Sequence, residues 1–264
     1  MHPHEARSAV AIAARAARTA GDMLRGVRPL EIRGKSNPRD LVTEWDVRSE
    51  QTIREVLAES GYPVLGEEGG QSGASDARYR WLVDPIDGTV NFAHGLPLWS
   101  ISIALEEIGA GIEVGVVYAP MLGWWFEASR GGGARDGSGN PLCVSTRATL
   151  EEAMLATGFP YDRATNPDNN FAAWDHFQRV AGSCRRLGCA SIDLCLVAQG
   201  IYDGYWESRL QPWDLAAGAL IVAEAGGRVT DTRGQPFDPH SGEAVATNGA
   251  IHGGLVTELA RVRS

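Results

Sequence analysis

The segment 84–89 reads D-P-I-D-G-T and directly follows a short apolar run that predicts a buried strand. Pro85 fixes its own φ and pushes Asp84 toward an extended conformation, so we expect a sharp turn there. Two carboxylates three residues apart across such a turn can converge on one point. Gly88 lets the backbone approach a ligand closely, and Thr89 adds a hydroxyl and an N–H group. N–H groups exposed at a turn or helix start can bind an anion.

Carboxylates that face a phosphate repel it unless a cation lies between them. Hard oxygen ligands with space for water suit Mg²⁺, so the segment indicates metal-bridged phosphate chemistry. A plain Asp/Gly turn is the simplest alternative. A second alternative is the haloacid-type phosphatase, which carries D-x-D-G-T with the first Asp as nucleophile. Here the spacing is D-x-x-D and the segment begins at residue 84, which argues against an aspartyl-phosphate mechanism.

Three further segments carry acids. The stretch 35–46 places two Asp residues, the second being Asp46, around a predicted helix N-terminus. The turn 66–69 reads G-E-E-G, where solvated charge is the ordinary interpretation. Asp214 lies in the first turn of an apolar helix, where the helix dipole favours the ionised form and where helix capping alone would explain an acid.

Taken together, in this order and spacing, these segments resemble the inositol monophosphatase family of Mg²⁺-dependent, Li⁺-inhibited sugar phosphatases. The resemblance runs from Lys35 to about Gly227. The motifs W-L-V-D-P-I-D-G-T-V-N-F and P-W-D-L-A-A-G carry it, and G-E-E supports it. It implies a layered αβαβα sandwich, α+β in the first half and α/β in the second, and commonly a homodimer.

The resemblance also implies a metal cluster of two to three Mg²⁺ ions. The positions that match Glu67, Asp84 and the carbonyl of Ile86 would bind one ion. Those that match Asp84, Asp87 and Asp214 would bind a second, with Asp84 bridging the two. A third, looser ion would use Glu67 and water. Two such cations can stabilise the entering and departing oxygens of an in-line displacement.

The catalytic roles follow from the same resemblance. Glu67 and Thr89 would orient the attacking water, and Asp46 would polarise the Thr89 hydroxyl. The N–H groups of Gly88 and Thr89 would hold the phosphate oxygens. The carboxylates of Asp87 and Asp214 complete the phosphate end of the site, Asp214 through water on the leaving-group side.

At the sugar end, Ala190 would offer backbone contacts to the substrate, and Glu207 would accept hydrogen bonds from sugar hydroxyls. The alternative for Glu207 is a solvated strand end. Cys189 stands where the family usually has Ser or Thr, which removes a strong hydrogen-bonding hydroxyl. Lys35 is expected on a loop near the metals, with an ordinary surface lysine as the alternative.

The predicted activity is hydrolysis of a small polyol or sugar monophosphate, such as an inositol monophosphate, by metal-activated water. The rival substrates within the family are histidinol phosphate, fructose 1,6-bisphosphate, NADP and 3′-phosphoadenosine phosphate. The rival of another class is a regulatory binding protein, because some bacterial relatives associate with the transcription machinery.

Composition narrows the setting of this chemistry. The 264 residues carry 24 Lys+Arg against 33 Asp+Glu, a net charge of −9, which argues against direct nucleic-acid binding. No apolar run approaches the roughly 20 residues that span a bilayer, so we expect a soluble chain. The four cysteines form no C-x-x-C pair, which favours reduced thiols and a cytoplasmic location.

The elements that must position these residues can be read from periodicity. An Arg- and Ala-rich N-terminal stretch with Arg7, Arg18 and Arg25 on one side predicts a helix ending at Gly26 rather than a transit peptide. Loops are expected at 131–133 and 136–141, and the aromatic run 124–126 is expected to cover a sheet face or a dimer seam. Helices are predicted over 44–60, 169–180, 191–198 and 212–225, and strands over 81–83, 100–105, 112–118, 124–127, 154–157 and 201–206. We expect two subdomains, 1–140 and 141–264, packed as one unit.

Overall fold

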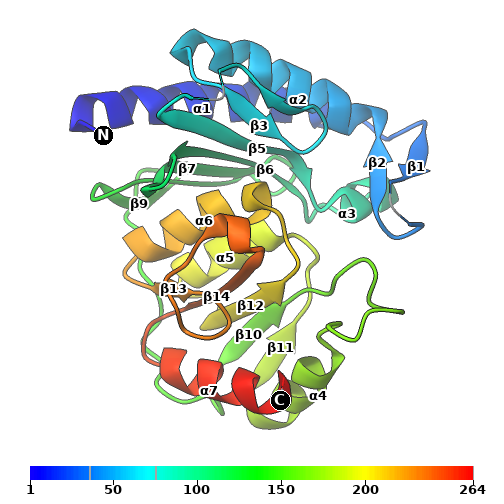
Figure 1. Ribbon diagram of the computed structural model, residues 1–264, viewed down its shortest axis with the longest axis vertical. Helices are drawn as coiled ribbons and strands as arrows, with labels where there is room; N and C mark the ends of the chain where they lie inside the picture. Colours follow the sequence, from blue (N-terminus) through cyan, green and yellow to red (C-terminus); the bar gives the residue numbers. More distant parts are fainter. Residues whose placement is uncertain (36, 75, 264) are drawn as a thin grey trace.

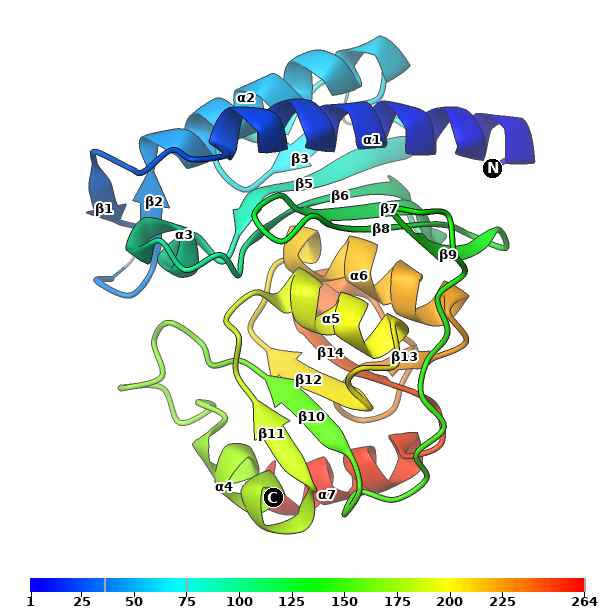
Figure 2. The ribbon, with the colours of Figure 1, turned by 180° about the vertical axis from the view of Figure 1, so that it is seen from behind.

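A computed structural model describes residues 1–35, 37–74 and 76–263, with Arg263 described by its backbone alone. Ser36, within the acidic stretch 35–46, and the last residue of the predicted second subdomain lie outside the described residues. The described chain forms five layers, helices–sheet–helices–sheet–helices, from top to bottom in Figure 1 and again in the opposite view of Figure 2. This layering confirms the predicted αβαβα sandwich.

The upper sheet is mostly antiparallel and lies beneath two long helices, α1 (Pro3–Leu24) and α2 (Glu44–Leu57). Its seven strands are, in spatial order, β4 (Gly70–Ser72), β3 (Val64–Gly66), β5 (Tyr79–Asp87), β6 (Ser100–Glu107), β7 (Gly111–Ala119), β8 (Trp124–Ser129) and β9 (Gly133–Asp136). The helix α1 buries a stripe of small residues, which lets it lie close to the sheet. A short hairpin of β1 (Ile32–Gly34) and β2 (Leu41–Thr43) precedes α2.

The middle layer consists of α5 (Ala190–Ala198) and α6 (Pro212–Glu224), which are apolar on nearly every face because a sheet lies on each side of them. Beneath them lies a mixed sheet with strands β11 (Ser183–Arg185), β10 (Met154–Thr157), β12 (Gly204–Ser208), β14 (Glu243–Thr247) and β13 (Arg228–Thr230) in spatial order. The outer layer is α4 (Phe171–Val180) and α7 (His252–Arg263). The small elements are α3 (Thr89–His94), η1 (Ala58–Ser60) and η2 (Pro239–Ser241).

The strand that carries D-P-I-D differs from the prediction. We predicted a strand over 81–83 and a turn at Asp84, whereas β5 continues to Asp87. The pairing with β6 shifts register between Asp84 and Asp87, so Pro85 lies in a β-bulge, where a missing N–H is tolerated. The chain turns only at Gly88, whose φ of 88° is readily reached by glycine.

The predicted boundaries of one further strand and of one loop were also wrong. The predicted strand 201–206 begins only at Gly204, because the N–H groups of Ile201 and Tyr202 both donate to the Leu196 carbonyl and close the end of α5. The predicted loop 131–133 is shorter, because Gly133 already pairs with Ser129 as the first residue of β9. Within the described ranges, none of the helices combines a membrane-spanning length with enough apolar character.

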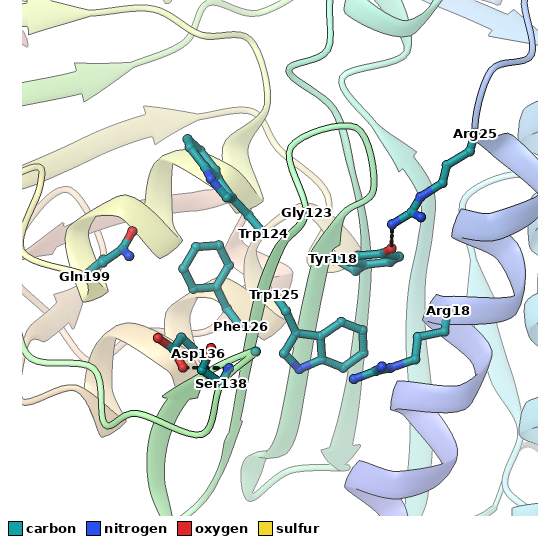
Figure 3. A pocket seen from close by; sticks show the side chains of 11 residues that line it. Arg18, Arg25, Tyr118, Gly123, Trp124, Trp125, Phe126, Asp136, Ser138 and Gln199 are labelled. Atoms are coloured by element: carbon teal, nitrogen blue, oxygen red, sulfur yellow. Dashed lines mark hydrogen bonds between the residues drawn. The ribbon is translucent and has the colours of Figure 1, made fainter.

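The aromatic run of β8 covers both faces of the upper sheet. Trp125 lies on the α1 side, with the Arg18 guanidinium 4.4 Å from its ring centroid. Phe126 and Trp124 pack on the opposite face, against the middle helices. Figure 3 shows these side chains around a surface pocket, with Arg18 of α1 and Arg25, the residue that follows α1, on its other side. The predicted sheet-covering role therefore holds on two faces, and a dimer seam stays a prediction.

Candidate active site

A cavity of about 410 Å³ lies between the upper sheet and the layers below it. Strands, helix starts and loops from both halves of the chain line it. All of the predicted site residues except Asp46 are on its surface: Lys35, Glu67, Asp84, Ile86, Asp87, Gly88, Thr89, Ala190, Glu207 and Asp214. Residues predicted from separate stretches of sequence thus share one pocket.

The acids of the pocket come from three elements. Glu67 follows the last residue of β3, and its N–H donates to the Val83 carbonyl at 3.2 Å, which anchors it to β5. Asp84 and Asp87 lie on β5 itself. Asp214 is the third residue of α6, where its carboxylate accepts from the Gln211 N–H at 2.7 Å. Helix capping, the alternative interpretation of Asp214, therefore does occur, and it also fixes the acid at the pocket.

The carboxyl group of Asp84 is the centre of this cluster. The carboxyl groups of Glu67 and Asp214 both lie within hydrogen-bonding reach of it. Asp84 is 2% exposed, and its Oδ1 accepts from the Ile86 N–H at 3.0 Å. Burial raises the pKa of Asp84 well above its usual range, and the negative charges of Glu67, Asp87 and Asp214 raise it further.

Asp87 is held by the N-terminus of α5. Its Oδ2 accepts from the Ser191 N–H at 2.7 Å, from the Ser191 hydroxyl at 2.5 Å and from the Cys189 thiol at 3.2 Å. Its Oδ1 faces the Ala190 N–H at 3.3 Å. Burial still raises the pKa of Asp87, although the bonds from Ser191 and Cys189 act in the opposite direction. Cys189 thus replaces the usual hydroxyl with a weaker donor.

Thr89 and Asp46 meet as the resemblance implied. The Thr89 hydroxyl lies 3.0 Å from Asp46 Oδ1 and 3.0 Å from the Ile86 carbonyl, and its one proton can serve one acceptor at a time. Asp46 Oδ2 accepts from the N–H and hydroxyl of Thr43, the N-cap of α2. Burial raises the pKa of Asp46 to about 6, against the Thr43 bonds that lower it. Asp46 lies behind Thr89 and outside the pocket lining.

Lys35 supplies positive charge at the mouth of the pocket. Its Nζ donates to Glu67 at 2.7 Å and to Glu68 at 2.5 Å. Burial alone would lower the pKa of Lys35, but the two glutamates hold it above its ordinary value. Lys35 is therefore a partner of the acids, although it lies at the surface of the protein.

Glu207 lies at the other end, on β12. Its carboxylate accepts from the Tyr205 hydroxyl at 2.7 Å and is 9% exposed, so the alternative of a solvated strand end is wrong. Burial raises the pKa of Glu207 to about 7. A Cβ at Gly158 would lie 2.0 Å from Glu207 Oε1, so only glycine leaves room for this carboxylate.

Several supporting residues were not predicted. Glu50 of α2 is 3% exposed, accepts from the N–H groups of Glu68 and Gly69 and bonds Arg54 at 2.7 Å, which shapes the G-E-E-G turn. A Cβ at Gly66 would meet the Glu50 carboxyl at 2.5 Å. Ser191 was missed as well. For Glu50, the glycines at 66 and 69 were the local signal in the sequence, because they leave space for a side chain to approach the backbone of the G-E-E-G turn.

The acids fit a divalent cation by their chemistry. In the described part of the chain, Lys35 is the basic residue that pairs with an acid of the cluster, and Asp84, Asp87 and Asp214 have no basic partner. A cation among these hard oxygen ligands would remove the mutual repulsion. In the conformation described, no group of three or more of the described His, Cys, Asp and Glu side chains is arranged so that it could hold a metal ion. The bonds of Asp87 to Ser191 and of Lys35 to Glu67 occupy ligand oxygens in this conformation.

The layered fold and this acid-lined pocket are those of a phosphoric monoester hydrolase, and comparisons with known proteins agree. The inositol monophosphatase family model matches residues 5–264. The chain belongs to that family.

Named relatives cover nearly the whole chain. It is 42% identical over 234 residues to the inositol-1-monophosphatase of Synechocystis sp., covering 87% of this chain and 80% of the relative. It is 42% identical to the Nus factor SuhB of Pseudomonas aeruginosa, covering 94% of each. The solved structure of inositol monophosphatase from Anabaena (Nostoc) sp. superimposes with a TM-score of 0.88 at 38% identity, covering 97% of this chain and 96% of that one.

Proposed function

We propose that the protein is a Mg²⁺-dependent phosphomonoesterase that hydrolyses a small phosphorylated polyol or sugar by direct attack of water. The observation that carries the proposal is the convergence of Glu67, Asp84, Asp87 and Asp214 in one pocket beside Gly88 and Thr89. The hydrolase class is shared with the family, and the metal and the substrate are the proposed parts.

The residues of the pocket divide the chemistry between them. Glu67, Asp84 and the Ile86 carbonyl would hold one ion, Asp84, Asp87 and Asp214 a second, and Glu67 with water a third. Bound Mg²⁺ supplies charge stabilisation of the phosphoryl group and makes water more acidic. Thr89, held by Asp46, and Glu67 would orient the attacking water.

The phosphoryl oxygens would lie against the backbone at the start of α3. No side chain in the described residues caps this short helix, and its N-cap Gly88 and first residue Thr89 both line the pocket. Their N–H groups are therefore oriented donors for an oxyanion. Ala190 and Glu207 would contact the polyol, with Glu207 accepting from hydroxyl groups.

A panel of phosphomonoesters tests the activity. Purified protein is assayed for phosphate release from an inositol monophosphate, histidinol phosphate, fructose 1,6-bisphosphate, NADP and 3′-phosphoadenosine phosphate, with Mg²⁺ and with EDTA. We expect Mg²⁺-dependent release from at least one polyol or sugar phosphate. No release from any of them with Mg²⁺, or equal release with EDTA, would contradict the proposal.

The same resemblance supports four further proposals: inhibition by Li⁺, a homodimer, a cytoplasmic location and a preference for inositol phosphates. Titration with Li⁺ of the Mg²⁺-dependent rate tests the inhibition, and light scattering, which measures the molar mass in solution, tests the homodimer. Cell fractionation tests the location, and the substrate panel above tests the preference for inositol phosphates.

A second candidate function is association with the transcription machinery. The observation that favours it is the 42% identity to a relative named a Nus factor. An affinity pull-down from a lysate of the source organism, with and without EDTA, tests it. Recovery of RNA polymerase in both conditions would support this function, and its absence in both would reject it.

A further inference from the structure

One arginine of the active-site pocket forms no ion pair with an acid of the described residues, although its charge acts on Glu207 and on the buried Asp193. Arg186 lines the pocket beside Glu207, whose pKa its positive charge lowers against the effect of burial. Its guanidinium lies against the backbone of Gly188, where an added Cβ would come within 2.5 Å of Nη1. No acidic side chain in residues 1–35, 37–74 or 76–262 forms an ion pair or hydrogen bond with Arg186.

The other arginine of the pocket is different. Arg209 is one of two described non-glycine residues with a positive φ, 65°. It also lines the pocket, but pairs with Asp162 at 3.0 Å. Its charge is therefore neutralised within the protein, while the charge of Arg186 is available to a ligand.

Arg186 belongs to a small group of cations. Burial lowers the pKa of Arg163, and the nearby charges of Arg186 and Arg39 lower it further. The Arg163 guanidinium donates to the Pro160 carbonyl at 3.3 Å, and neither Arg39 nor Arg163 has an acidic partner among the described residues. Like charges in one region repel each other, and a bound anion relieves that repulsion.

The pocket thus has a cluster of acids at the β5 end and a guanidinium beside Glu207 at the other end. The acids at the β5 end account for one phosphoryl group, held through cations. The guanidinium at the Glu207 end needs no metal to bind an anion, because it offers a planar fork of N–H donors that matches phosphate and carboxylate oxygens.

We propose that Arg186 binds a second anionic group of the substrate, so that the preferred substrates are polyol or sugar phosphates with an additional phosphate or carboxylate. The inference rests on the proposed phosphomonoesterase activity and narrows its substrate class. The group that is hydrolysed lies among the acids, and the group that is retained lies on Arg186.

The test compares Arg186→Ala with Arg185→Ala. Arg185 is the matched control, because it carries the same charge one residue away, donates to Ser183 and to the Cys184 carbonyl, and lies outside the pocket lining. The substrates are an inositol monophosphate, an inositol bisphosphate and a small monophosphate with a carboxylate. We expect the wild type to favour one of the doubly anionic substrates by about tenfold in kcat/KM, the effect of one charge-assisted hydrogen bond.

Arg186→Ala should remove most of that preference, mainly through KM, while Arg185→Ala retains it and Arg186→Lys retains part of it. Raising the ionic strength should reduce the preference of the wild type. Which doubly anionic substrate is favoured tells phosphate from carboxylate. The inference is overturned if the wild type hydrolyses all substrates with the same kcat/KM, or if Arg186→Ala lowers kcat/KM equally for all of them. Either result leaves the proposed function standing. Hydrolysis of none of the substrates by the wild type overturns both.

Discussion

Asp84 and Asp203 are both buried aspartates, but their surroundings are opposite. Asp203 is fully buried and accepts from Arg147 at 3.0 Å, from the Met154 N–H at 2.7 Å and from the Ser145 hydroxyl. Asp84 has one N–H donor and three acids as neighbours. The comparison shows that burial of an acid does not by itself indicate function. A buried charge without compensation does, because folding alone gives no reason to keep it.

The largest expected effect comes from the uncompensated cluster. Asp87→Asn removes a proposed ligand and a charge but keeps an oxygen that the Ser191 N–H can reach. We expect kcat to fall by several orders of magnitude while circular dichroism and the melting temperature show a folded protein. Asp175→Asn, an exposed acid paired with Arg179, is the control and should retain full activity. Near-normal turnover by Asp87→Asn would reject the site.

Replacing Asp203, whose charge is compensated by its partners, should lower stability and leave activity unchanged. Asp203→Ala leaves the Met154 N–H and the Ser145 hydroxyl without their acceptor. We expect the free energy of unfolding to fall by about 3 kcal/mol, measured by urea denaturation, with kcat of the remaining folded protein unchanged. Asp175→Ala should cost less than about 0.5 kcal/mol, as an exposed pair does. A loss of less than about 1 kcal/mol for Asp203→Ala would show that its partners do not compensate it.

A smaller effect of opposite sign is expected at the centre of the cluster. Asp84→Asn removes one of several repelling charges, so metal-free protein should gain about 1 kcal/mol of stability as it loses activity. Thermal unfolding in EDTA measures the gain. Asp203→Asn is the matched substitution and should destabilise. If Asp84→Asn also destabilised the metal-free protein, the acids would not be under repulsion.

The effect that is smallest at neutral pH concerns the buried His252, whose hydrogen bonds are all satisfied only while its ring is neutral. The Thr230 hydroxyl donates to the Asp231 carbonyl and so accepts from His252 Nε2, and the Thr247 hydroxyl accepts from the Gly249 N–H and so donates to His252 Nδ1. Burial lowers the pKa of His252 to about 4, aided by Arg228. The contribution of this group is present above the unfolded pKa of about 6.5 and is lost as pH falls toward 4.

Urea denaturation at several pH values between 7 and 4 measures this loss. The slope attributable to His252 should stay below about 1.4 kcal/mol per pH unit, the limit for one proton. The variant His252→Gln should lack that part of the slope. An identical pH dependence in the two proteins would show that His252 does not remain neutral in the fold.

The pocket acids could be predicted because their signals are local, whereas the layered architecture was implied by the family resemblance. Asp84, Asp87 and Asp214 lie in motifs where a proline, a glycine or a helix start sets the backbone. The family resemblance then supplied what no single motif could, namely that these distant segments meet. The division at residue 140 stays a prediction, although β9 ends the upper sheet at Asp136 and β10 begins the lower one at Met154.

What could not be predicted depends on tertiary contacts. Strands of three residues such as β3, β11 and β13 carry too few positions for an alternating pattern. The continuation of β5 through Pro85 depends on a bulge against β6. Ser191 and Glu50 matter because of which backbone groups come close to them, and Arg186 because no described acid forms an ion pair with it. None of these relations is local in sequence.

The most direct test of the central claim is a crystal structure of the protein soaked in Mn²⁺ as a substitute for Mg²⁺, with anomalous scattering used to locate the ions. The account predicts at least two anomalous peaks in the pocket, bound by Glu67, Asp84, Asp87 and Asp214 with Asp84 shared. Side chains left apart, with no peak among them at saturating Mn²⁺, would contradict it.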